Sequence, residues 1–433
     1  MASQIQTETP IHLLTRPSKA QLIEAFVGKH LDTLRTPAFI VDRKLFAANC
    51  ASMHRKAREW GASFRAHLKT HKTVEGTRLQ LKSEEDQTHA VVVSTMMEAW
   101  EVVKGGLVAD STVKDILYGL PVAVNKVADL AALRNELEKY GGTVRLLIDH
   151  PGQVTFLEEY ESRQATPKRW SVFIKINGGQ NRAGVIPGSS DFFGLLETSL
   201  KSPAIILHGF YGHAGNAYGS TSLSEASEFL SKEVESVNDA AKSALELISS
   251  TYPNAVVSNP FVLSVGSTPT AHAASAEARK ALSKILHGVL ELHAGNYPML
   301  DLQQQHTGLI DHARIAQRVR ATVISYYPSR GADGSDEAMV DAGAIAFSKD
   351  TGPSGIFGEV LGLPWTLSRI SQEHGTLVSK EKNVEPLKLG TVVDIVGQHA
   401  CLISAAYPWY YVVDHEVYEG NSVVDVWVPW KGW

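Results

Sequence analysis

The stretch SFRAHLK (63–69) predicts a buried β-strand that delivers a lysine to its carboxyl end. Short apolar runs like this one alternate with amphipathic stretches of helical length from about residue 44 to about residue 305, as βαβ units do. There are eight such runs: SFRAHLK (63–69), AVVVS (90–94), DILYGLP (115–121), VRLLID (144–149), WSVFIKIN (170–177), AIILHGFYGH (204–213), NPFVLSVGS (259–267) and VLELHAGNY (289–297). Because eight parallel strands alternating with helices make a TIM-like (β/α)8 barrel, we predict an α/β protein of that class.

The segments between these runs carry helical periodicity. VAVNKVADLAALRNELEKYG (122–141) and SEASEFLSKEVESVNDAAKSALELISS (224–250) repeat apolar residues at spacings of three and four. After about residue 306 the pattern changes to β-branched and aromatic runs broken by Gly, Pro, Asn and Asp, as in TVVDIVGQHACLISAAYP (391–408). The second region is therefore predicted to be a mostly β domain.

The segment RTPAFIVD (35–42) is strand-like although it precedes the first predicted barrel helix. We expect it to pair with the C-terminal sheet. The predicted organisation is an N-terminal segment over 1–43, a barrel over 44–305 and a β domain over 306–433.

Composition limits the class of function. The chain has 433 residues, 44% of them hydrophobic, and a net charge of −5, which does not favour a nucleic-acid groove or an anionic membrane surface. Its two cysteines, Cys50 and Cys401, do not form a disulfide framework and suit a reducing compartment. The start MASQIQTETPIHLLTRPSKA (1–20) lacks an apolar signal core, and no run of about 18 apolar residues follows. We expect a cytoplasmic enzyme acting on a small molecule.

Candidate chemistry begins at the end of the first barrel strand. RAHLKTHKT (65–73) places Lys69 near the carboxyl rim, where barrel enzymes keep their reactive groups. A lysine whose pKa is lowered by desolvation and by neighbouring cations can add to an aldehyde. His67, His71 and Lys72 are the candidate cationic neighbours of Lys69.

A second candidate is the turn in LSVGSTPT (263–270), where a strand runs into Gly266, Ser267 and Thr268 and then toward the helical pattern AHAASAEARKALSKIL (271–286). Backbone amides and hydroxyls of such a turn can hold a phosphate group at the late strands of a barrel. The sequence therefore predicts a phosphate-binding turn here.

Together these motifs resemble the fold-type III pyridoxal-phosphate enzymes, in the branch of D-threonine aldolase and eukaryotic D-serine dehydratase that is related to alanine racemase. The resemblance spans nearly the whole chain and rests on TPAFIVD (36–42), RAHLKTHK (65–72), GGQNRAGV (178–185), GFYGHAGNAY (209–218), SVGSTPT (264–270), ELHAGNYPMLD (291–301) and QHAC (398–401). The order and spacing of these motifs make the resemblance specific.

The resemblance implies roles for single residues. Lys69 would hold pyridoxal 5'-phosphate as a Schiff base, and Gly266, Ser267 and Thr268 would hold its phosphate. The residues implied to line the cofactor pocket are Arg182, near the phenolic oxygen of the cofactor, together with Tyr211, His213 and Tyr218. On residue type alone, the tyrosines would be core aromatics and Arg182 a surface charge.

The motif QHAC (398–401) indicates a metal. If it lies in a strand, His399 and Cys401 point to the same face, and imidazole with thiolate is a zinc-type pair. The resemblance favours zinc, because D-serine dehydratases of this family carry His-x-Cys where the aldolases carry His-x-Asp. Only two protein ligands are evident, so water, substrate or a further ligand that the sequence does not identify would complete the coordination.

The implied activity is a lyase reaction, in which water is eliminated from D-serine and the resulting aminoacrylate hydrolyses to pyruvate and ammonia. Lys69 would remove the α-proton and zinc would assist departure of the β-hydroxyl. The alternatives are D-threonine aldolase and D-threo-3-hydroxyaspartate dehydratase of the same family, with an amino-acid racemase and a non-catalytic cofactor-binding protein ranked lower. A homodimer is implied by the same resemblance.

Overall fold

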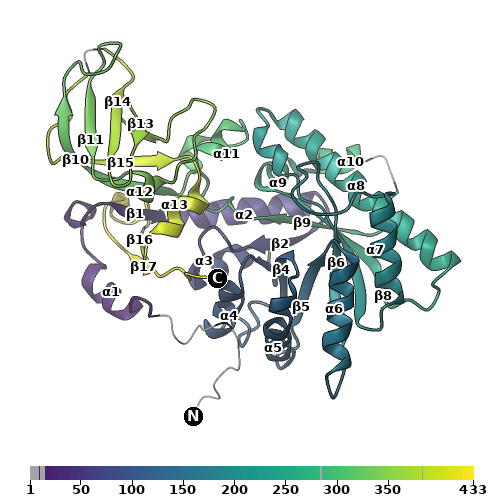
Figure 1. Cartoon of the computed structure of the whole chain (residues 1–433). Helices are drawn as coiled ribbons and strands as arrows, with labels where there is room; N and C mark the ends of the chain where they lie inside the picture. The colour runs from purple at the N-terminus through teal and green to yellow at the C-terminus, as the bar shows by residue number, and fades with distance from the viewer. Residues whose placement is uncertain (1–8, 10–14, 283–284, 383) are drawn as a thin grey trace.

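The computed structural model describes residues 9, 15–282, 285–382 and 384–433. Eight parallel strands close into a barrel in chain order. They are β2 (Ser63–His67), β3 (Ala90–Val93), β4 (Asp115–Pro121), β5 (Thr143–Ile148), β6 (Trp170–Lys175), β7 (Ile205–Tyr211), β8 (Val257–Val265) and β9 (Val289–Ala294). Each of the eight predicted runs overlaps one of these strands, and the pairing of β2 with β9 closes the ring, so the predicted barrel is confirmed (Figure 1).

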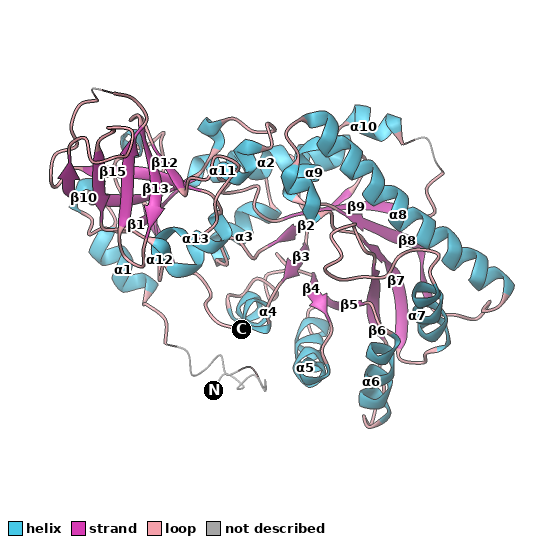
Figure 2. Ribbon diagram, turned by 45° about the horizontal axis from the view of Figure 1, so that its top comes forward, coloured by secondary structure: helices cyan, strands magenta, loops and turns pink. Residues whose placement is uncertain are grey.

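The barrel helices lie around the outside of the strands (Figure 2). They are α2 (Arg43–Glu59), α3 (Val74–Leu81), α4 (Met96–Lys104), α5 (Val127–Glu138), α6 (Pro151–Ser162), α7 (Ser190–Lys201), α8 (Leu223–Ser250), α9 (Thr268–Ala273) and α10 (Ala276–Ala281). The pattern 224–250 becomes α8, whereas 122–141 splits into the short turn η3 (Val124–Lys126) and α5. Residues 283 and 284 of the pattern 271–286, and most of segment 1–20, lie outside the described residues.

Polar side chains begin most of these helices. Thr73 accepts a hydrogen bond from the backbone of Gly76 at the start of α3, and Thr95 does the same for Glu98 in α4. Such caps satisfy backbone donors that a helix start leaves free. Because the cap at Thr73 lies four residues after Lys69, it also fixes where the chain leaves the barrel rim.

The remaining strands form one nine-stranded sheet in the order β11-β14-β13-β12-β15-β10-β1-β16-β17. These strands are β1 (Ala38–Asp42), β10 (Gln317–Tyr327), β11 (Glu337–Val340), β12 (Gly358–Val360), β13 (Trp365–Ile370), β14 (Gly375–Ser379), β15 (Val392–Gly397), β16 (Tyr410–Val413) and β17 (Asp425–Trp427). As predicted, β1 joins this sheet, antiparallel to β10 and parallel to β16.

Short helices connect and border this sheet: α1 (Lys19–Phe26), α11 (Leu302–His306), α12 (Ala344–Phe347) and α13 (Ala400–Ala406). In Figure 1, α13 lies between the sheet and the barrel. The prediction of a strand through QHAC is wrong, because β15 ends at Gly397 and the chain turns into α13. No helix in the described part of the chain is both long enough and apolar enough to cross a membrane.

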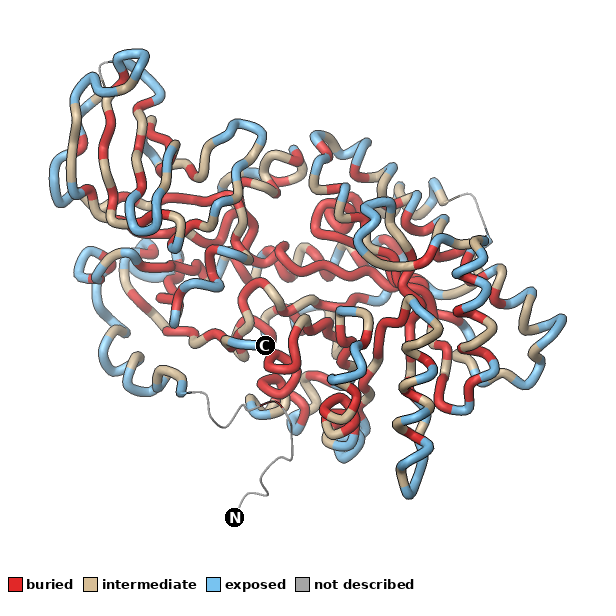
Figure 3. The backbone as a smooth tube through the Cα atoms, in the orientation of Figure 1, coloured by how far each residue is buried: buried red, intermediate tan, exposed pale blue. Residues whose placement is uncertain are grey.

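Buried residues run through the strands of both parts of the molecule (Figure 3). Inside the barrel, an apolar layer of Val92, Leu117, Leu147, Phe173 and Tyr211 separates two polar regions. One lies toward the amino ends of the strands and the other at the carboxyl rim, where Lys69 follows β2.

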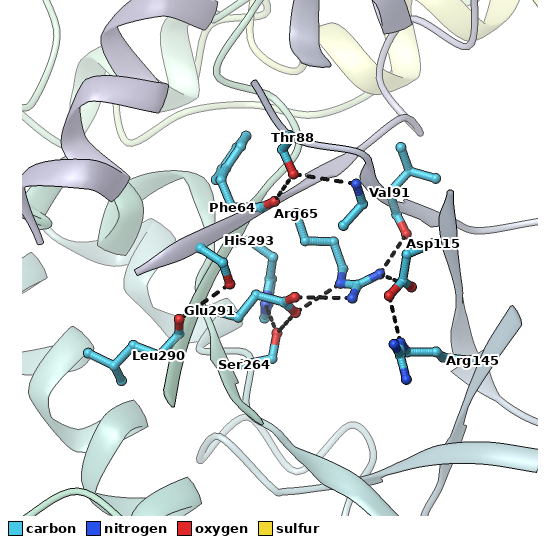
Figure 4. A network of polar contacts seen from close by, with 12 residues as sticks. Phe64, Arg65, Thr88, Val91, Asp115, Arg145, Ser264, Leu290, Glu291 and His293 are labelled. Atoms are coloured by element: carbon cyan, nitrogen blue, oxygen red, sulfur yellow. Dashed lines mark hydrogen bonds and ion pairs between the residues drawn. The ribbon is translucent and has the colours of Figure 1, made fainter. Parts of the chain in front are cut away.

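The polar region below the apolar layer is centred on Arg65, which is 1% exposed. Its guanidinium forms ion pairs of 2.8 Å with Glu291 and 2.7 Å with Asp115, and Asp115 also pairs with Arg145 at 2.7 Å (Figure 4). The two arginines lower the pKa of Asp115 to about 2, although burial alone would raise it. The network therefore stays charged in the barrel interior.

We expect Arg65→Ala to reduce the free energy of unfolding by about 3–5 kcal/mol, because it leaves Glu291 buried without its partner. Urea denaturation followed by circular dichroism measures the loss. Arg58→Ala is the matched control, since Arg58 pairs with Glu85 and Asp86 on the surface and should shift the midpoint little. Equal shifts in the two variants would contradict a structural role for the buried network.

Candidate active site

Lys69 lies in the turn that follows β2 and is partly exposed. The next residue, Thr70, is buried and donates to the backbone oxygen of Gly295 at 3.2 Å. The backbone oxygen of Thr70 accepts from Ser404 of α13 at 2.7 Å. The lysine is therefore held between the barrel rim and α13.

Two of the neighbours expected to be cationic are neutral. Burial lowers the pKa of His67, whose ring contacts Ser94 at 2.8 Å, and the charge of Lys69 lowers it further. Burial also lowers the pKa of His71, to about 4. The third neighbour, Lys72, pairs with buried Glu98 at 3.1 Å.

The turn at Gly266 makes a close approach to β9. Gly266 has a φ of +142°, and a Cβ there would lie 2.1 Å from the backbone oxygen of His293, so a side chain does not fit. Ser267 then caps α9 by accepting from the backbone of Thr270, and the hydroxyl of Thr270 accepts from the backbone of Ser267. The hydroxyl of Thr268 accepts from the backbone of Asn296 at 3.1 Å and contacts Tyr218, whose pKa burial raises.

Tyr211 and His213 stand at the carboxyl end of β7. His213 is within 2.7 Å of the backbone oxygen of Gly266 through Nδ1, so Nδ1 carries the hydrogen. Burial, followed by the charge of Lys175, lowers the pKa of His213 and keeps the ring neutral. Tyr211 is buried and stacks on His293.

Arg182 is exposed in the loop after β6, and no hydrogen bond or ion pair of its guanidinium is present among the described residues. Its charge nevertheless contributes to lowering the pKa of Lys175 and His213, so it belongs to the same rim. Lys175 was not predicted from the sequence. It ends β6, is 6% exposed, and burial lowers its pKa to about 7.

His399 and Cys401 come together at the start of α13, and not by the alternation of a strand. The two side chains are in hydrogen-bond contact, which together with the imidazolium charge lowers the pKa of the Cys401 thiol against the effect of burial. The thiolate in turn raises the pKa of His399 to about 9, again against the effect of burial. The sulfur also contacts the hydroxyl of Thr70 at 3.1 Å, which links the pair to the lysine turn.

Two carboxylates that the sequence did not reveal support this pair. Asp350 contacts Nδ1 of His399 at 2.7 Å. Asp301 is fully buried and accepts from the backbone of Ala400 at 2.7 Å and of Gln304 at 2.9 Å. Asp350 lies in a loop of Gly, Pro and Ser residues that carries no periodic signal, so only the fold brings it to His399. Among the described residues, no cluster of three or more His, Cys, Asp or Glu side chains has the geometry of a metal site.

A cavity of about 680 Å³ opens beside His399. It is bordered by Tyr218, by Gln303 and His306 of α11, and by the loop that holds Asp350. The arrangement therefore combines a partly exposed lysine, a glycine-containing turn before a helix, and an imidazole–thiolate pair with open space next to it.

Two family models match the chain. The alanine racemase N-terminal domain matches residues 41–282, and the putative serine dehydratase domain matches residues 316–413. The first covers barrel strands β2 to β8, and the second covers sheet strands β10 to β16 together with α13.

Relatives match over nearly full length. The chain is 42% identical to the D-serine dehydratase of Schizosaccharomyces pombe, with 96% of each chain covered, and 33% identical to that of Saccharomyces cerevisiae, with 96% of this chain and 100% of the relative covered. Among solved structures, the D-threo-3-hydroxyaspartate dehydratase from Delftia sp. HT23 has a TM-score of 0.76 at 28% identity, covering 94% of this chain and all of that one. One structure of that dehydratase is a Cys-to-Ala mutant in the metal-free form. The chain therefore belongs to the D-serine dehydratase family, and its barrel is an alanine racemase N-terminal domain.

Proposed function

We propose that this chain is a pyridoxal-phosphate-dependent lyase that converts D-serine to pyruvate and ammonia, with zinc bound by His399 and Cys401. The observation that carries the proposal is the contact of 3.1 Å between Thr70, which follows Lys69, and the sulfur of Cys401. It brings the candidate cofactor lysine and the candidate metal ligands to one place. The relatives named as D-serine dehydratases support the substrate.

The residues of the barrel rim fit pyridoxal phosphate. Lys69 is partly exposed and can react with an aldehyde, and the turn at Gly266 follows the carboxyl end of β8, where barrel enzymes hold phosphate groups. In this proposal Ser267 and Thr268 hold that phosphate, while Tyr211, His213, Tyr218 and Arg182 border the cofactor. When bound, the cofactor supplies an electron sink that makes the α-proton of an amino acid removable.

The His399–Cys401 pair fits a zinc ion, because imidazole and thiolate are ligands that zinc prefers and the two side chains are in contact at the start of α13. Asp350 would then hold the imidazole through Nδ1, as carboxylates next to metal-bound histidines do. The neighbouring cavity leaves room for water or substrate to complete the coordination. The metal-free mutant of the Delftia relative is consistent with a metal at a cysteine in this family.

In the proposed reaction, different side chains of the chain act at the α-carbon and at the β-hydroxyl. Lys69 takes the proton from the α-carbon as a general base. The lowered pKa values of His67 and His213 keep both rings neutral, so neither ring adds a positive charge next to Lys69. His399 and Cys401 would hold the cation that assists departure of the β-hydroxyl. His399 and the loop of Asp350 border the neighbouring cavity, and we expect a second copy of the chain to complete a homodimer.

The test is an absorbance spectrum of the purified protein followed by product analysis with D-serine. We expect absorbance from a cofactor bound to lysine and formation of pyruvate with one equivalent of ammonia. Glycine and an aldehyde from D-threonine, without pyruvate from D-serine, would instead identify an aldolase. L-serine formed from D-serine without pyruvate would identify a racemase.

The phosphate-binding turn gives a separate prediction. Replacing Ser267 and Thr268 together by Ala should weaken cofactor binding by about 2–4 kcal/mol, taking about 1–2 kcal/mol for each hydrogen bond to a charged group. Cofactor titration followed by fluorescence measures the change, and the absorbance at saturating cofactor should stay normal.

Because Ser267 also caps α9, this double variant loses a helix cap as well as two hydroxyls. Ser275→Ala is the matched control, since Ser275 caps α10 by accepting from the backbone of Ala278. It should leave cofactor affinity unchanged. Unchanged affinity in the double variant would count against this turn as the phosphate site.

A further inference from the structure

A chain of polar contacts connects the charged centre of the barrel to the ring of His293 (Figure 4). Arg65 binds both carboxylate oxygens of Glu291, through Nε at 2.8 Å and through a terminal nitrogen at 3.0 Å. The hydroxyl of Ser264 donates to Glu291 at 2.8 Å, and the same oxygen lies 3.0 Å from Nδ1 of His293. Every member of the chain is buried.

The direction of these hydrogen bonds fixes the state of His293. Because Glu291 can only accept, the hydrogen of Ser264 is used there, and the oxygen of Ser264 must accept from Nδ1 of His293. Burial lowers the pKa of His293, and the nearby charges of Lys175 and Arg65 act in the same direction, so the ring is neutral. His293 is therefore a single tautomer whose plane is tied to the barrel interior.

The ring held in this way supports Tyr211. The two ring centroids are 4.1 Å apart and the planes differ by 9°, while Nζ of Lys175 lies 4.5 Å from the same tyrosine ring. In the barrel order β6 lies next to β7 on one side, and β9 follows β8 on the other, so Lys175 and His293 reach Tyr211 from strands on opposite sides of β7.

Among the described residues, the hydroxyl of Tyr211 has no hydrogen-bond partner. Burial, together with the negative charge of Glu291, raises the pKa of Tyr211, so the hydroxyl keeps its hydrogen. The ring of Tyr211 is held in place and its hydroxyl is free to donate a hydrogen bond to a bound ligand.

We propose that His293 is a positioning residue, which holds Tyr211 so that its hydroxyl meets the bound cofactor or substrate, and that Ser264, Glu291 and Arg65 set the plane of His293. The inference rests on the proposed function. Stacking alone restrains the distance between two rings but leaves them free to slide, whereas the bond to Ser264 fixes where the imidazole lies. His293 thus acts through Tyr211 and does not itself need to touch the ligand.

The test is a double-mutant cycle on the holoenzyme with His293→Asn and Tyr211→Phe. Asn can still donate to Ser264 but lacks the stacked ring, and Phe keeps its ring but lacks the hydroxyl. We expect His293→Asn to lower kcat by about 100-fold in the wild-type background, as a misplaced contact group does. In the Tyr211→Phe background the further loss should stay within about a factor of two. His293→Gln serves in the same cycle if His293→Asn does not fold.

Two readouts that do not depend on turnover accompany the cycle. The absorbance maximum of the bound cofactor and its dissociation rate should change in the same direction in both single variants, and no further in the double variant. Independent, additive losses in kcat and in these two quantities would overturn the inference. If the wild type shows no cofactor absorbance, the proposed function itself fails, so the two failures are distinguishable.

Discussion

Lys69→Ala should abolish turnover of D-serine and remove the absorbance of lysine-bound cofactor. Lys69 is the residue to which the proposed function gives both the cofactor bond and the α-proton, so no other group at the rim can replace it. Lys175 is a neighbouring lysine whose pKa of about 7 would also allow it to react, but it is 6% exposed and covered by Tyr211. Losing both nucleophilic and base catalysis should cost more than the 100–10,000-fold that a general base contributes.

The measurement is borohydride reduction of the wild-type holoenzyme followed by peptide mapping. The pyridoxyl group should be found on Lys69. Lys72 provides a matched control because it lies three residues away and pairs with Glu98. Lys72→Gln should keep the label on Lys69 and retain cofactor absorbance. A label on Lys175 or Lys72 in the wild type would refute the assignment of Lys69.

The barrel could be predicted from the sequence because its strands are short, largely apolar runs separated by helices of regular period. DILYGLP (115–121) illustrates this, since the predicted and observed bounds coincide in β4. The pairing of RTPAFIVD (35–42) with the C-terminal sheet followed from its strand composition and its place before the first barrel helix. In both cases local pattern and final environment agree.

The sequence failed where local pattern and environment differ. The run 391–408 is rich in β-branched and small apolar residues, yet the chain changes from β15 to α13 at His399. The helix is stabilised by a contact outside the run, the hydrogen bond from Ser404 of α13 to the backbone of Thr70. Asp350 and His293 were missed for another reason. Asp350 contacts His399, and His293 contacts Tyr211, and in each pair the two residues lie far apart in the sequence. Contacts of this kind produce no regular spacing in the sequence from which they could be predicted.

Removing the metal should stop departure of the β-hydroxyl without preventing the binding of cofactor and D-serine at Lys69. Chelation should stop pyruvate formation, because the proposed zinc at His399 and Cys401 would assist departure of the β-hydroxyl, while Lys69 should still hold the cofactor and bind D-serine. Added zinc should restore the chelated wild type. His399→Ala and Cys401→Ala should behave like the chelated enzyme and should not respond to zinc, since each lacks a ligand.

The structure also predicts a graded series around this site. Asp350→Asn keeps both ligands but weakens the contact at Nδ1 of His399, so activity should fall by about 10–100-fold with zinc still bound at high concentration. The ligand variants should lose more than this. Cys50→Ala is the control for the thiol, because Cys50 is buried in α2 and is the other cysteine of the chain. It should retain metal content and activity.

Metal analysis together with D-serine turnover, before and after chelator, decides the outcome. If zinc is bound as proposed, metal content and pyruvate formation fall together, while cofactor absorbance persists and its response to D-serine remains. That persistence matters because Thr70 joins the lysine turn to Cys401, so a merely structural ion would disturb both sites when removed. Full activity with no bound metal would end the zinc proposal, and it would leave β-elimination at this rim to Lys69 and its neighbours alone.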